Sequence, residues 1–221
     1  MLNQAPSEQP TDIEEYVAGL TARLARMLDP DDPQRAECQL ELAQNLVALE
    51  RGPESWPLAR EAFDTFIAHE EFELAAHTAH ALFASGEPDA LVALGHGIWL
   101  AVTFPVDVSL TVSLLTDVIE ETPPDADGAA VAAGVAQYIV DLRAQGRQLD
   151  DLRFITGKAL AEVAFRHSGV TSPDQFKGWV ERLELNDPET MLRRLRAIVD
   201  VLVEQHWWFD VNEMRTRVPS N

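Results

Sequence analysis

The sequence contains a single cysteine, Cys38, among 221 residues, which excludes an intramolecular disulfide. Lysine is almost as scarce, because Lys158 and Lys177 are the only two. A lone thiol is typical of proteins that work in a reducing compartment. Residues 1–16 also lack the basic and apolar stretches of a secretory signal. We therefore expect a cytoplasmic protein.

Strand patterns and unbroken apolar runs are also missing. The most apolar stretch, residues 91–119, is interrupted by His96, Pro105 and Asp107. A membrane-spanning helix needs about 20 consecutive apolar residues. Because the stretch is broken well before that length, we expect no membrane insertion.

Pro105 divides this stretch into two predicted helices, 89–103 and 108–121. Proline removes a backbone donor and disfavours the helical conformation of the residue before it. Asp107 or Ser109 can then cap the second helix. Both helices are apolar on nearly every side, which is typical of helices buried on more than one face. We expect this pair at the centre of the fold.

Positive charge is in short supply: 17 basic side chains face 37 acidic ones, for a net charge of −20. This balance disfavours nucleic acid, whose phosphates need a basic surface, and anionic membranes. The charge is uneven, because residues 1–127 carry a net −19 and residues 143–196 a net +2. We expect the acidic half either to bind a basic partner or to form a solvated surface that keeps the protein soluble.

Helical periodicity and short proline- or glycine-containing breaks recur along the chain, predicting an all-α fold of about ten helices. We expect stacked antiparallel hairpins or a compact bundle. The predicted organisation is a disordered lead at 1–11, a single helical domain at 12–210 with a candidate seam at 122–125, and a tail at 211–221. Gly52, followed by Pro53, is expected to end the second helix in a left-handed conformation.

Residues 58–88 carry a regular pattern of small and aromatic residues. On one predicted helix the pattern comprises Phe72, Ala75, Ala79 and Leu82, with Pro88 after them. One helix earlier, a related pattern comprises Ala59, Phe63 and Phe66. This spacing resembles that of tetratricopeptide helical hairpins. The resemblance implies stacked helical hairpins and a protein-binding role, and it implies no catalytic residues.

Four histidines fall within residues 69–96, and they suggest a divalent metal site. Glu73, His77 and His80 are spaced i, i+4 and i+7, so they share one side of a helix. If this helix and the next form an antiparallel hairpin, His96 lies at the same height as His77. The four side chains would then offer nitrogen and oxygen ligands to a metal ion. The alternative is an exposed polar stripe beside a buried, hydrogen-bonded His96.

The run from His206 to Phe209 is the other unusual feature. The tenth helix is predicted to continue to Phe209, which places Trp207 on the polar side near Arg196. Exposed tryptophan beside arginine is typical of interaction hot spots, so Trp207, Trp208 and Arg196 are candidate interface residues. Core packing of the rings is the alternative.

Phosphate-loop, dinucleotide-binding and nucleophile-elbow motifs are all missing from the sequence. We therefore expect a non-enzymatic helical protein that binds another protein, or a second copy of itself, as an adaptor, assembly factor or regulator. The first alternative is a metal- or cofactor-dependent all-α enzyme or small-ligand carrier built on the histidine group. A carrier's cavity could also be lined by Trp99, Phe104 and the small-residue helix at 128–134.

Overall fold

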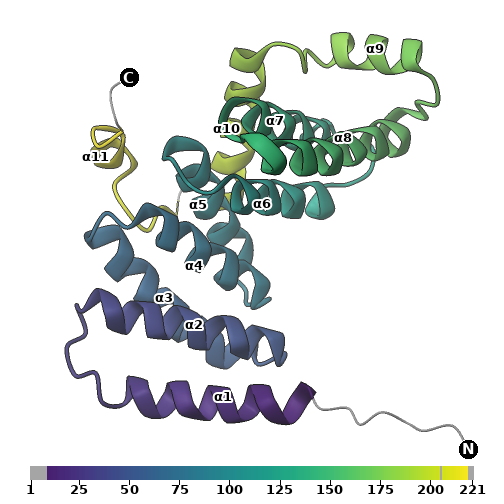
Figure 1. The fold of residues 1–221 in the computed structure, drawn as a ribbon. Coiled ribbons are helices and arrows are strands. Elements are labelled where there is room, and N and C mark those ends of the chain that lie inside the picture. Colours follow the sequence, from purple (N-terminus) through teal and green to yellow (C-terminus); the bar gives the residue numbers. More distant parts are fainter. Residues whose placement is uncertain (1–8, 205, 219–221) are drawn as a thin grey trace, which may run out of the picture. The chain divides into compact units, whose positions relative to one another are not determined.

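A computed structural model describes residues 9–204 and 206–218, and all regular structure in these residues is helical (Figure 1). The all-α prediction is confirmed. Eleven helices occur in the described residues, and the one beyond the predicted ten, α11 (Val211–Arg215), lies in the predicted tail. None of the helices in this part of the chain is both long enough and apolar enough to cross a bilayer.

The helices form two compact units, one up to Ala90 and one from Leu91 onward. The candidate seam at 122–125 lies within the second unit and stays a prediction. Whether 12–210 behaves as a single domain stays a prediction.

The first unit contains four helices in which chain neighbours pack against each other, and α2 also contacts α4. Their bounds are α1 (Gln9–Leu24), α2 (Pro33–Ala48), α3 (Gly52–Ala68) and α4 (Phe72–Ala84). α1 begins inside the predicted 1–11 lead, and residues 1–8 lie outside the described residues. Short turns between the helices make each neighbouring pair an antiparallel hairpin.

α3 and α4 pack against each other, and both carry residues of the pattern that resembles tetratricopeptide hairpins. The fully buried residues of this pattern are Ala59, Phe63, Phe66, Ala75, Ala79 and Leu82. Paired helical hairpins are therefore present, as the sequence indicates.

The second unit contains the remaining helices. Their bounds are α5 (Ala90–Thr103), α6 (Val108–Glu121), α7 (Asp127–Arg143), α8 (Gly146–Ser168), α9 (Pro173–Arg182), α10 (Pro188–Val203) and α11. α7 packs against α6, α8 and α10. The predicted cap of α6 is confirmed, because Asp107 Oδ1 accepts from the backbone nitrogens of Ser109 and Leu110 at 2.8 and 3.2 Å.

Small residues let helices of the second unit approach closely. All residues from 129 to 136 on α7 are buried. A Cβ atom at Gly134 would lie only 2.8 Å from Met191 Sδ on α10. On α5, a Cβ at Gly95 would lie 2.7 Å from Val203 Cγ1. The small-residue segment of α7 therefore lies inside the second unit.

Candidate functional site

His96 is fully buried on α5, and both of its ring nitrogens have backbone partners. Nδ1 lies 2.7 Å from the carbonyl oxygen of Val92, which can only accept, so Nδ1 carries a proton. The backbone nitrogen of Trp208 lies 3.0 Å from Nε2 and donates to it. These two contacts fit a single neutral tautomer. His96 therefore fixes the segment that contains Trp208.

The rings of Trp99, Trp207, Trp208 and Phe209 form an aromatic cluster around His96. Trp208 stacks on the imidazole, with centroids 4.3 Å apart and planes 13° apart. Trp207 and Phe209 meet it edge-on at 5.2 and 5.3 Å. Trp99 joins from α5, with its centroid 5.3 Å from that of Phe209. The cluster thus fastens the segment after α10 onto α5.

The aromatic run lies beyond α10, so the prediction of a helix continuing to Phe209 is wrong. α10 ends at Val203, and Glu204 takes a left-handed conformation with φ of 47°. Trp207 is consequently half-buried in the cluster and does not project from a polar helix face. The interface role of Trp207, Trp208 and Arg196 stays a prediction.

The predicted metal ligands lie on two helices of different units. Glu73, His77 and His80 are on α4, and His96 is on α5. Among residues 9–204 and 206–218, no three His, Cys, Asp or Glu side chains gather in an arrangement suited to a metal ion. The metal role of the four residues stays a prediction.

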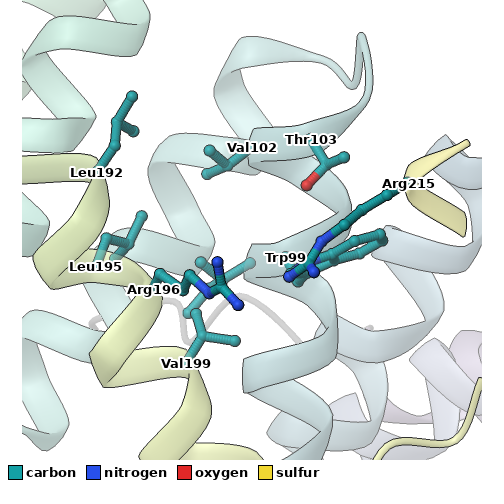
Figure 2. A pocket seen from close by; sticks show the side chains of 9 residues that line it. Trp99, Val102, Thr103, Leu192, Leu195, Arg196, Val199 and Arg215 are labelled. Carbon is teal, nitrogen blue, oxygen red and sulfur yellow. The ribbon is translucent and has the colours of Figure 1, made fainter. Parts of the chain in front are cut away.

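A pocket of about 260 Å³ lies between α5, α10 and α11 (Figure 2). Aliphatic side chains form most of its wall, and the Trp99 indole forms one side. Two guanidinium groups extend into the same space, one from α10 and one from α11. The lining residues are Ile98, Trp99, Val102, Thr103, Leu192, Leu195, Arg196, Val199 and Arg215.

The two arginines of this pocket are weakly neutralised. Arg196 Nε lies 3.9 Å from Asp200 Oδ2, and both side chains are more than half exposed. Arg215 Nη1 donates to the Asn212 side-chain oxygen at 3.2 Å, and no carboxylate in the described part of the chain pairs with it. Exposed pairs of this kind contribute little stability. The pocket therefore combines apolar walls with positive charge in a chain of net charge −20.

A second feature is a row of exposed apolar side chains on α8. Phe154, Ile155 and Phe165 are 75%, 51% and 61% exposed. Lys158 and Glu162 lie between them, one helical turn apart, and neither forms an ion pair within the described residues. We call these five residues the α8 stripe. Aromatic side chains are enriched at protein–protein interfaces relative to the rest of the surface.

No family model, curated protein or solved structure matches this chain. The pocket and the α8 stripe are the two features of the second unit that suggest a function. Sequence reasoning missed Arg215 because it placed this residue in a tail. It also missed the α8 stripe, although Phe154 and Phe165 are eleven residues apart, a spacing that puts both on one helical face.

Proposed function

We propose that this chain is a non-enzymatic, cytoplasmic helical protein that acts by binding another protein through the α8 stripe. The observation that carries the proposal is the exposure of Phe154 and Phe165, because burying aromatic rings is among the larger gains at protein interfaces. The helical hairpins of the first unit, including the tetratricopeptide-like segment 58–88, support the same kind of role.

The partner that best matches the α8 stripe is a second copy of the chain. A twofold axis places the same patch on both sides of an interface. When two α8 helices lie antiparallel about an axis midway between Lys158 and Glu162, Lys158 of each copy faces Glu162 of the other. The same register places Ile155 opposite Phe165. Attraction between charges and burial of apolar surface then favour one arrangement.

The charge distribution favours this region for self-association. Residues 1–127 carry a net −19, so two copies repel each other through that part of the chain. Residues 143–196, which contain α8, carry a net +2. Two copies therefore meet with the least repulsion where the exposed aromatic rings lie.

Sedimentation velocity tests this proposal directly. The wild-type protein is expected to form a dimer, and Phe165→Glu is expected to be monomeric because it buries an unpaired charge at the interface. Leu28→Glu is the matched control, since Leu28 is 89% exposed in the first unit, and it should remain dimeric. Lys158→Glu and Glu162→Lys should each weaken the dimer, and the double variant should restore it.

The results distinguish self-association through α8, binding of a different protein, and an interface elsewhere on the chain. A wild-type chain that is monomeric at every concentration tested refutes self-association through α8. Ala161 is exposed on α8, beside Glu162. If a photo-crosslinker at Ala161 then captures no protein in cells, the interaction function itself is refuted. A dimer that is unchanged by Phe165→Glu and by the charge swaps places the interface elsewhere.

A further inference from the structure

We infer that the pocket between α5, α10 and α11 binds a small organic carboxylate with an apolar or aromatic body. The observation behind this inference is the pair of arginines on an otherwise apolar pocket. It does not depend on the α8 stripe, so the two proposals succeed or fail separately.

The apolar part of the pocket is held in place by packing. Ile98, Leu195 and Val199 are buried and form a fixed aliphatic wall. Trp99 is braced by an edge contact with Phe104 and a tilted contact with Phe209, with ring centroids 5.9 and 5.3 Å away. Pockets that are formed before binding lose less conformational freedom when a ligand enters. A flat ring or short hydrocarbon is therefore suited to this wall.

The charged part of the pocket selects for an anion. Arg196 and Arg215 extend into the same space from different helices (Figure 2). Guanidinium groups present paired donors that match the two oxygens of a carboxylate. The nearest carboxylate partner of Arg196, Asp200, is 3.9 Å away, too far for a strong hydrogen bond. An anionic ligand would also relieve the repulsion between two cations that border one cavity.

The size of the pocket favours a small molecule. A volume of about 260 Å³ lies just below the usual range for ligand pockets, which is roughly 300–1,000 Å³. This space accommodates one compact apolar group with its carboxylate at the arginines. A peptide that ends in an apolar residue has similar chemistry at its C-terminus, so it is included as a competitor in the test.

The test is calorimetric titration of the full-length protein with 2-naphthoate. 2-Naphthalenemethanol, which has the same rings and no charge, should bind at least tenfold more weakly. Arg196→Gln and Arg215→Gln should each lower the affinity for 2-naphthoate about tenfold, as expected for the loss of one charge-assisted hydrogen bond. Arg193→Gln is the control on the same helix, because Arg193 is exposed and does not line the pocket.

A variant that fills the pocket provides an independent check. Val102 is half-buried in the wall, so Val102→Trp should abolish binding while circular dichroism shows an unchanged helical content. The inference is overturned if the neutral analogue binds equally well, if both arginine variants bind normally, or if 2-naphthoate does not bind at all. A peptide with a free apolar C-terminus that binds a hundredfold more tightly than 2-naphthoate would instead assign the pocket to a peptide.

Discussion

Replacing Arg143 with methionine tests how the end of α5 is stabilised. Pro105 has no N–H group, so it cannot donate to the carbonyl oxygen of Ala101, four residues earlier. Arg143, in the last turn of α7, supplies the missing donor. Its Nη1 lies 2.7 Å from Ala101 O and 3.2 Å from Phe104 O, and its Nη2 lies 2.7 Å from Val102 O. One side chain thus satisfies three carbonyl groups.

The expected loss of stability follows from these contacts. A hydrogen bond from a charged donor stabilises a protein by about 1.5–3 kcal/mol. We count two such bonds, because Nη1 divides its strength between two acceptors. Burial lowers the pKa of Arg143, which reflects a desolvation cost that offsets part of the gain. Arg143→Met should therefore lower the free energy of unfolding by about 3 kcal/mol, out of a typical total of about 5–15.

Urea unfolding followed by circular dichroism measures this loss. Arg143→Lys keeps the charge but lacks the forked geometry, so its cost should be intermediate. Pro105→Ala restores an N–H group at position 105, so Arg143→Met should cost less in that background. A cost below about 1 kcal/mol, or an equal cost in both backgrounds, would refute this account of the end of α5.

Three further predictions concern single sites. Asp107→Ala should lower the free energy of unfolding by about 1 kcal/mol at pH 7. Burial acts to raise the pKa of Asp107, but the N–H groups of α6 outweigh it and the net pKa is lowered. The advantage of Asp107 over Asp107→Asn, measured by urea unfolding, should therefore be lost as the pH falls from about 4 through the lowered value. Gly95→Ala should lower the melting temperature because its Cβ would lie 2.7 Å from Val203 Cγ1, whereas Gly157→Ala, with no atom nearer than 3.9 Å, should not. Cys38 is buried and its thiol pKa is raised by burial, so a thiol reagent should label it only after urea is added.

The central helices illustrate what local signals predict well. Proline at 105 and a capping aspartate at 107 fix the end of one helix and the start of the next. The observed helices, α5 and α6, agree with the predicted 89–103 and 108–121 to within one residue. The all-α class follows from helical periodicity and from similar proline- and glycine-containing breaks elsewhere along the chain.

Gly52 shows why other local inferences fail. The sequence suggests that this glycine ends α2 in a left-handed conformation, yet Glu50 takes that conformation with φ of 58°. Gly52 instead begins α3, where a Cβ would lie 2.1 Å from the carbonyl oxygen of Ser85 at the end of α4. The glycine thus satisfies a packing requirement between helices. The end of α10 could not be predicted either. Its cap residue, Glu204, is left-handed, and a left-handed glutamate has no distinctive sequence signal.

The candidate site depends on contacts that a single sequence does not encode locally. His96 stands out as a polar residue on an apolar helix, and the run from Trp207 to Phe209 stands out as three consecutive rings. Physical reasoning alone requires that a buried imidazole find one donor and one acceptor. Such reasoning cannot identify the two hydrogen-bond partners of His96, because both are backbone groups and backbone groups are nearly the same at every position. The donor lies 112 residues away at Trp208, and this single hydrogen bond joins two features that the sequence presents as unrelated. The pocket beside them follows from that connection, since it is the segment fastened by Trp208 that leads into α11 and brings Arg215 to the pocket.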